Sequence, residues 1–126
     1  MNAKFDVAGH IYILLTLIFT VYGQLVLKWQ MGHAGPMPEP VSDKLLFLFQ
    51  QFLKPWILSG LVAAFLASLA WMAAMTRLDL NYAYPFMSLA FIIVLGFAII
   101  FLDEPLSAQR VFGTLLVVSG LITMTR

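Results

Sequence analysis

Five polar side chains recur at every fourth position of an otherwise apolar stretch near the N-terminus. They are Tyr12, Thr16, Thr20, Gln24 and Lys28. On an α-helix a four-residue step overshoots one turn by about 40°, so this row winds slowly down one side. Its hydroxyls and amide could line a groove for a polar head group, with Lys28 binding an anion. The row is also typical of helix–helix contacts with a lysine reaching the membrane surface, and the pattern leaves both open.

Three further candidates flank two later apolar stretches. Glu104 stands just before a helix start, where a carboxylate would stabilise the helix dipole and free N–H groups. It could instead pair with Arg110, about one turn further on, or with a substrate amine at the mouth of a groove. Tyr84 opens the third apolar stretch, where tyrosines usually belong to the aromatic belt at the membrane surface; lining the groove is the alternative.

Small residues mark the last apolar stretch as a surface for close helix contact. Gly113 and Gly120 are seven positions apart on one helical face, and Ser119 is beside them. Such spacings let helices approach each other closely, either within the bundle or between subunits. We expect Gly113, Ser119 and Gly120 to form an oligomer interface. The second stretch has a similar row, Gly60, Ala64 and Ser68.

The composition excludes most classes of protein. Of 126 residues, 62% are hydrophobic and 10% charged, which is too much apolar surface for a soluble domain of this size to bury. A net charge of +1 provides no basic surface for nucleic acid. The absence of cysteine removes thiol chemistry, and two histidines with six acids make a metal site improbable. None of the common catalytic motifs occurs, so we expect no catalytic residues, no cofactor and no enzyme activity.

Four stretches are long enough to cross a bilayer, which takes about 20 mostly apolar residues. They cover about 8–30, 55–76, 83–102 and 105–125. Because backbone groups must be hydrogen-bonded inside lipid, each stretch is expected to be a helix. Between the first two, residues 42–53 carry apolar side chains on one face and are too short to span. The prediction is an all-α integral membrane protein forming one domain over 1–126, with a short amphipathic helix at the membrane surface. A loop helix packed on the bundle is the alternative for 42–53.

Three segments of the chain resemble a known family. These are Tyr22-Gly23-Gln24 followed by Lys28, the run Leu80-Asn81-Tyr82-Ala83-Tyr84-Pro85, and Asp103-Glu104-Pro105-Leu106-Ser107 before the last span. Together they resemble the four-helix, small-multidrug-resistance-like members of the drug/metabolite transporter superfamily. The chain is most similar to the small subunits of the flippase for 4-amino-4-deoxy-L-arabinose-phosphoundecaprenol in bacterial inner membranes.

This resemblance implies that the chain flips an undecaprenyl-phosphate-linked sugar as a subunit of a small dimeric flippase. Lys28 would meet the phosphate, Thr20 and Gln24 would bond sugar hydroxyls, and Glu104 with Arg110 would line the entrance. Thr16 and Tyr84 are further substrate contacts. The partners would be the polyprenyl-phosphate sugar, membrane lipids, and a second copy of the chain or a similar small subunit.

Two other functions remain open. The chain is also similar to the small multidrug resistance exporters of organic cations, which need a buried glutamate midway along the first helix. Thr20 stands at that position, and no acid lies between Asp6 and Glu39. Proton-coupled export therefore has no titrating group there. The last alternative is a membrane scaffold subunit that transports nothing.

Overall fold

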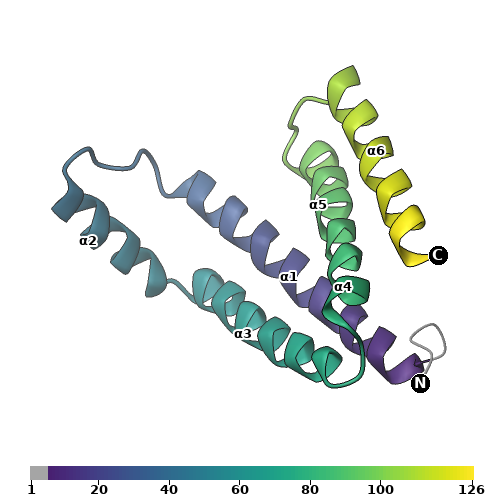
Figure 1. The fold of residues 1–126 in the computed structure, drawn as a ribbon. Helices are drawn as coiled ribbons and strands as arrows, with labels where there is room; N and C mark the ends of the chain where they lie inside the picture. Colours follow the sequence, from purple (N-terminus) through teal and green to yellow (C-terminus); the bar gives the residue numbers. More distant parts are fainter. Residues whose placement is uncertain (1–5) are drawn as a thin grey trace.

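Long apolar runs in this chain form helices throughout, as lipid-exposed backbone requires. The computed structural model describes residues 6–126, and four of its helical segments are long and apolar enough to span a membrane. The expected all-α membrane fold is confirmed (Figure 1). The elements in chain order are α1 (Val7–His33), α2 (Val41–Phe52), α3 (Pro55–Met75), α4 (Leu80–Ala83), the 3₁₀ turn η2 (Tyr84–Met87), α5 (Ser88–Phe101) and α6 (Ala108–Thr125).

The helices α1 and α3 run side by side in opposite directions and form the main packed pair (Figure 1). Their backbones meet at two glycines. A Cβ atom added to Gly23 would lie 3.1 Å from the Gly60 carbonyl oxygen, and one added to Gly60 would lie 3.0 Å from Val26. Ala63 and Ala67 are buried one and two turns beyond Gly60. Of the small-residue row of the second stretch, Gly60 therefore packs within the bundle, whereas Ala64 and Ser68 are exposed.

A partly buried ion pair fixes the N-terminal end of α1 to the turn that follows α3. Asp6 caps α1 by accepting a hydrogen bond from the Gly9 amide at 2.9 Å, and it also accepts one from Arg77 Nε at 2.9 Å. Together, the Gly9 amide and the Arg77 guanidinium hold the pKa of the Asp6 carboxyl below its ordinary value of 3.8. Close by, the His10 ring and the Tyr82 hydroxyl are hydrogen-bonded at 3.0 Å.

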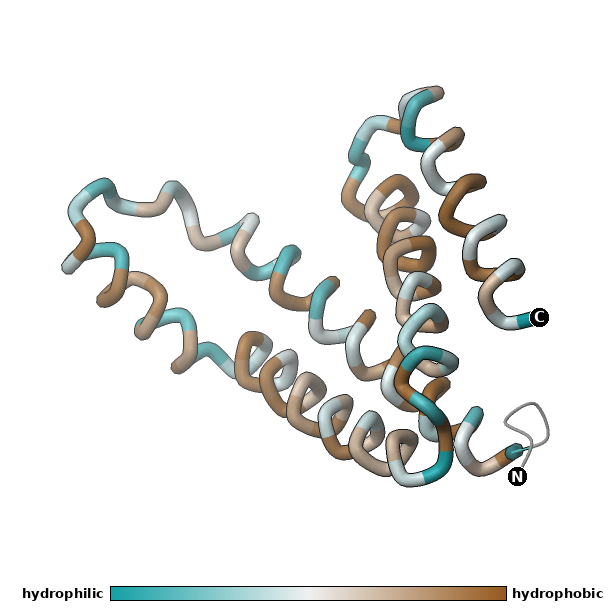
Figure 2. Tube along the Cα trace, viewed as in Figure 1, coloured by the Kyte–Doolittle hydropathy of each residue, from teal (hydrophilic) through white to brown (hydrophobic). Residues whose placement is uncertain are grey.

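The remaining long helices pack much less. The helix α5 crosses α1, whereas α6 lies along α5 and η2 and has no buried residue (Figure 1). Hydrophilic residues gather at the loops and helix ends, and apolar residues cover the lengths of α3 and α5 (Figure 2). The outer surface of α5 and α6 is therefore left to lipid or to another chain.

Several boundaries differ from those expected. The first helix has 27 residues, so it is about 40 Å long and exceeds the hydrocarbon core of about 30 Å. The third span begins at Leu80 and tightens into η2, where Pro85 lacks the N–H that a regular helix would use. The fourth helix begins at Ala108 rather than at residue 105, because the Ser107 hydroxyl caps it by accepting from the Arg110 amide.

The short helix α2 is present between α1 and α3, within one residue of its expected position, and it lies beyond the start of α3 (Figure 1). Its large apolar side chains are exposed, among them Leu45, Phe49 and Phe52. An exposed apolar face on a helix held between two membrane spans is typical of the membrane surface.

Candidate functional site

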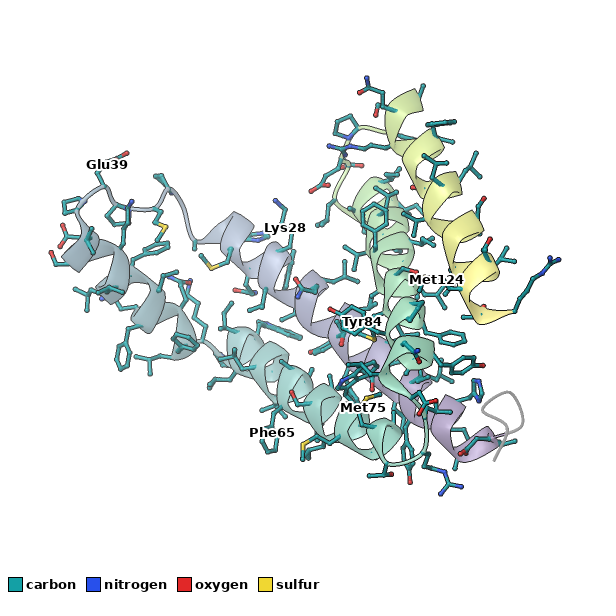
Figure 3. The ribbon with its side chains drawn as sticks, in the orientation of Figure 1. Lys28, Glu39, Phe65, Met75, Tyr84 and Met124 are labelled. Carbon is teal, nitrogen blue, oxygen red and sulfur yellow. The ribbon has the colours of Figure 1, made fainter. Side chains whose placement is uncertain are left out.

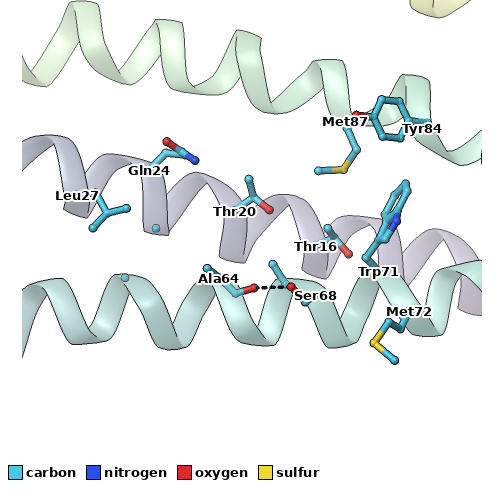
Figure 4. Close-up of a pocket in the computed structure, with 13 residues that line it drawn as sticks. Thr16, Thr20, Gln24, Leu27, Ala64, Ser68, Trp71, Met72, Tyr84 and Met87 are labelled. Carbon is cyan, nitrogen blue, oxygen red and sulfur yellow. Dashed lines mark hydrogen bonds between the residues drawn. The ribbon is translucent and has the colours of Figure 1, made fainter. Parts of the chain in front are cut away.

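A cleft of about 450 Å³ opens between α1 and α3, with η2 above it. We call it the polar cleft. Figure 4 shows Thr16, Thr20 and Gln24 reaching it from α1, Ser68 and Trp71 from α3, and Tyr84 and Met87 from the η2 segment. Three residues of the row are thus brought together with Tyr84, which lies far from them in the sequence, whereas Tyr12 and Lys28 do not line the cleft.

Access to the polar cleft increases along α1. The Thr16 side chain is buried and its hydroxyl donates to the Tyr12 carbonyl at 2.8 Å, within its own helix. Thr20 is half-buried and Gln24 is exposed. Among the residues drawn in Figure 4, the one hydrogen bond runs from Ser68 to Ala64, so the Thr20 hydroxyl and Gln24 amide have no partner within the cleft. Those two groups are therefore available to a bound molecule.

The polar cleft is bounded on one side by the close contact between α1 and α3. Gly23 and Gly60 both line the cleft, and the backbones of α1 and α3 approach closely at these two residues. Larger side chains there would push the helices apart or fill the space. The cleft therefore depends on two glycines that are 37 positions apart. The row of small residues that begins at Gly60 indicated close helix packing, but it did not predict a cavity.

Lys28 is one turn beyond Gln24 and lies outside the polar cleft itself. Its ammonium group is 3.8 Å from the Glu104 carboxylate, and the two side chains are 65% and 36% exposed. Figure 3 shows Lys28 projecting from the half of α1 that leads to α2. A wet ion pair at this distance contributes only about 0–1 kcal/mol, so either partner can be exchanged for another ion.

Glu104 and Arg110 share a second cleft of about 410 Å³ beside α5, but they do not form the ion pair that the sequence suggested. The Arg110 guanidinium instead donates to the Pro105 carbonyl at 3.2 Å. The capping role considered for Glu104 is also wrong, because Ser107 caps α6. The backbone of Asp103 is in the left-handed region with φ of 54°, which turns the chain so that Glu104 comes near Lys28.

Some residues of the polar cleft had no signal in the sequence. Trp71 lines it from α3 and contacts Tyr84 edge to face at 6.0 Å between ring centroids. Met87 closes the cleft from the end of η2. A single tryptophan or methionine in a uniformly apolar span looks like any other lipid-facing or core residue, so only the fold identifies these two.

The residues expected at an oligomer interface all lie on the weakly packed α6. Nothing in the described chain lies within 4 Å of a Cβ atom built on Gly113 or Gly120. The Ser119 hydroxyl donates to the Leu115 carbonyl of the same helix. Packing inside this bundle is thus not their role in one chain, and their role between chains stays a prediction.

Candidate metal sites are absent from the described residues 6–126, where no three metal-ligating side chains come together. The polar cleft instead has largely apolar walls between spanning helices, into which a few hydroxyls and the Gln24 amide project. Such a surface in a helical bundle is the arrangement used by proteins that move polar molecules through lipid.

Comparison with known proteins agrees with this class. Residues 12–126 match the EamA-like transporter family, and the chain belongs to that family. It is thus a multi-pass membrane transporter, and its resemblance to the drug/metabolite transporter superfamily is confirmed.

Three relatives are named as subunits of the same flippase. Two, from Sodalis glossinidius and Shewanella sediminis, are probable 4-amino-4-deoxy-L-arabinose-phosphoundecaprenol flippase subunits ArnF. They are 30% and 31% identical to the chain, covering 90% and 93% of it and 88% and 87% of their own lengths. The probable ArnE subunit of Pseudomonas aeruginosa is 29% identical, covering 90% of this chain and 94% of its own.

No solved structure matches the chain. The relatives are transporter subunits rather than enzymes, in agreement with the expectation from the missing catalytic motifs. Four apolar helices and bacterial flippase relatives make the chain a multi-pass protein of the bacterial inner membrane.

Proposed function

We propose that this chain moves an undecaprenyl-phosphate-linked sugar across the inner membrane, as one subunit of a small dimeric flippase. The observation that carries the proposal is the polar cleft, in which Thr20 and Gln24 present unpartnered hydrogen-bonding groups at membrane depth. The names of the relatives supply the substrate class.

The physical problem in flipping such a lipid lies entirely in its head group. A charged group at the bilayer centre costs several kcal/mol or more, whereas a polyprenyl chain is at home in hydrocarbon. A protein therefore needs to line a path for the sugar and phosphate only. The polar cleft is not enclosed by the described residues, so a tail could remain in lipid while the head moves along α1.

Lys28 is the proposed partner of the lipid phosphate. In the structure its ammonium faces Glu104 at 3.8 Å, and both side chains are partly exposed. A phosphate offers more negative charge and more acceptor oxygens than a carboxylate, so it displaces Glu104 readily from so weak a pair. Glu104 would then reclaim Lys28 when the lipid leaves, which prevents tight retention of the substrate.

The sugar is proposed to bind along the rest of the row. Thr20 and Gln24 would bond its hydroxyls, with Thr16 at the closed end, where its own hydroxyl is already bonded within α1. The Tyr84 ring is 64% exposed and is held against Trp71, so it offers an aromatic surface to a sugar ring. Arg110, in the cleft it shares with Glu104, would attract the anionic lipid to the entrance.

The second subunit is proposed to meet this chain on α6. That helix has no buried residue, and Gly113, Ser119 and Gly120 give it a face with little side-chain bulk. Both a second copy of this chain and a similar small subunit would fit such a face. The related ArnE and ArnF names describe two kinds of small subunit, which supports a pair of unlike chains.

Export of organic cations is the competing transport function, and the polar cleft argues against it. Among the described residues that line the cleft, none is acidic, so a cation entering it meets no counter-charge. Exchange of a cation for protons needs a buried titrating carboxylate. A scaffold without transport would leave the unpartnered groups of the cleft without a use.

The test is flipping of an undecaprenyl-phosphate-linked amino sugar in liposomes. The chain would be reconstituted alone and with a candidate sister subunit, and the exposed amine followed with a membrane-impermeant reagent. Wild-type protein should accelerate labelling of the inner-leaflet lipid. Lys28→Ala should slow that flipping at least tenfold, and Lys28→Arg should retain part of it because the charge remains.

Lys54→Ala is the matched control. Lys54 precedes α3 at the same end of the bundle as Lys28, and it lines neither of the clefts described above. Its replacement should leave flipping at the wild-type rate. If Lys28→Ala flipped the lipid as fast as wild-type protein at equal reconstitution, Lys28 would have no place in the mechanism.

A further inference from the structure

A third cleft lies on the other side of α1, between that helix and the C-terminal half of α5. Its volume is about 480 Å³, within the range of roughly 300–1,000 Å³ typical of ligand pockets. Four aromatic rings line it, Tyr22, Trp29, Phe97 and Phe101, and its other lining residues are aliphatic. We call it the aromatic cleft. No charged side chain lines it, so its chemistry suits a hydrocarbon.

The helix α1 is the common wall of the aromatic and polar clefts. Neighbouring residues of the helix divide between them: Gln24 lines the polar cleft and Leu25 the aromatic cleft. One turn on, Leu27 lines the polar cleft and Trp29 the aromatic cleft, with Lys28 between them. Because each residue turns the helix by about 100°, Lys28 stands at the edge that separates the two.

The opposite side of this edge comes from the end of α5. Leu102 lines the aromatic cleft, and two residues later Glu104 forms the ion pair with Lys28. A cationic site is thus bordered by a hydroxyl- and amide-lined cleft on one side and a ring-lined cleft on the other. That sequence of surfaces matches a molecule with a polar head, an anionic joint and a hydrocarbon chain.

Each ring of the aromatic cleft contacts another ring or a hydrogen-bond partner, although all four residues are at least 40% exposed in one chain. Phe97 and Phe101 stack at 5.3 Å between centroids, and Trp29 meets Trp56 edge to face at 5.5 Å. The Tyr22 hydroxyl is hydrogen-bonded to Ser59 on α3 at 2.9 Å. A polyprenyl chain gains no hydrophobic free energy by moving from lipid into an apolar cleft, because lipid is equally apolar. Selectivity must therefore come from shape, which the arrangement of the four rings provides.

We propose that the aromatic cleft binds the phosphate-proximal part of the polyprenyl chain of the transported lipid, while the head occupies the polar cleft. This rests on the proposed function. The lipid straddles α1 at Lys28, with its phosphate on the ammonium group. The cleft holds a short stretch of chain, and the remainder stays in the bilayer.

The test is photocrosslinking with undecaprenyl phosphate, which carries no sugar. p-Benzoylphenylalanine would replace Phe97 in the aromatic cleft, or Phe65 on α3 as a control. Phe65 is 63% exposed and points away from the bundle (Figure 3). Purified protein in phospholipid nanodiscs would be irradiated at rising undecaprenyl phosphate content, and adducts identified by mass spectrometry. Position 97 should give a saturable polyprenyl adduct at least fivefold above position 65.

Two further variants sharpen the result. Leu25→Trp narrows the cleft and should reduce the adduct at position 97 several-fold, while leaving that at position 65 unchanged. Lys28→Ala should shift saturation at position 97 to higher lipid content. Equal adduct yields at the two positions, or phospholipid adducts alone at position 97, would overturn the proposal.

Failure of this proposal is separable from failure of the proposed function. Sugar flipping with no saturable adduct at position 97 leaves the flippase in place and removes the chain site. A saturable adduct without flipping, alone or with a sister subunit, retains the chain site and removes transport.

Discussion

The two halves of this bundle are built on different principles. The α1–α3 half is closely packed, with backbones in contact at Gly23 and Gly60 and an ion pair between Asp6 and Arg77 at one end. The α5–α6 half makes few contacts with the rest of the bundle, and α6 has no buried residue. One half therefore forms a closely packed wall of the polar cleft, and the other half leaves an exposed surface for lipid or a second chain.

The ion pair between Lys28 and Glu104, which joins the two halves, is weak. Lys28 and Glu104 are partly exposed and 3.8 Å apart, so their pairing adds little to stability. A weak link between a rigid wall and a loosely attached pair of helices allows a ligand to separate them at small cost. The following changes test how different the two halves are.

The largest effect should come from Gly23→Leu. A Cβ atom there would meet the Gly60 carbonyl oxygen at 3.1 Å, and backbone cannot move aside as a side chain can. Overpacking of this kind lowers the free energy of unfolding by about 1–3 kcal/mol. Thermal unfolding of the purified protein in detergent would measure it.

Gly120→Leu is the control in the loose half, because its Cβ would meet nothing in the described chain. It should leave the melting temperature of the monomer unchanged while weakening any dimer formed through α6. Equal destabilisation by the two leucines would mean that the halves are packed alike.

Asp6→Asn should have the next largest effect. The native carboxylate is bonded by the Gly9 amide and Arg77, and its pKa is lowered. Because the folded pKa lies below 3.8, the stabilisation is present above that pH and is lost as the pH falls through the folded value. Melting temperature measured from pH 6 down to pH 2 should fall in the wild-type protein. The asparagine variant should start several degrees lower and lose this part of the pH dependence.

Glu104→Gln should change stability by less than about 1 kcal/mol, because the lost ion pair is wet and long. Its effect should instead be on ligand binding. With Lys28 released from its carboxylate, undecaprenyl phosphate should bind several-fold more tightly in a nanodisc titration, and flipping should slow as release slows. Unchanged binding would show that Glu104 does not compete for Lys28.

The smallest effect should be that of Asp103→Gly. Asp103 has a φ of 54°, a conformation that costs a non-glycine residue roughly 1–2 kcal/mol, although aspartate tolerates it better than most. Glycine removes that strain but loosens the unfolded chain, so the net change should stay within about 1 kcal/mol. Asp103→Val should instead lower the melting temperature. A large loss with glycine would point to a role for the carboxylate itself.

Much of the fold followed from hydropathy alone. Long uncharged runs must be helices in lipid, and the amphipathic pattern after Pro40 placed the short helix within one residue of its position. Boundaries were less certain where local chemistry decides them. Ser107 rather than Pro105 starts the last helix, and Pro85 tightens the third span into a 3₁₀ turn.

The candidate site was partly visible in the sequence. The four-residue spacing of Thr16, Thr20 and Gln24 placed them on one side of a helix, and they do share a cleft. The partners across that cleft, Trp71 and Met87, were not visible because apolar residues in an apolar span carry no positional signal. The Glu104 pairing was also missed, since it depends on a left-handed turn at Asp103.

The sequence by itself determined that the chain lies in a bilayer and where polar side chains fall on its first helix. Long apolar stretches must be helical in lipid, and polar residues at every fourth position must lie along one side of a helix. Only the tertiary structure decided which residues of other helices face the polar side of α1. Two glycines far apart in the chain bring α1 and α3 together, and the crossing of α5 gives α1 a second, ring-lined cleft. Local spacing fixes where a side chain points on its own helix, but contacts between helices depend on packing over the whole bundle.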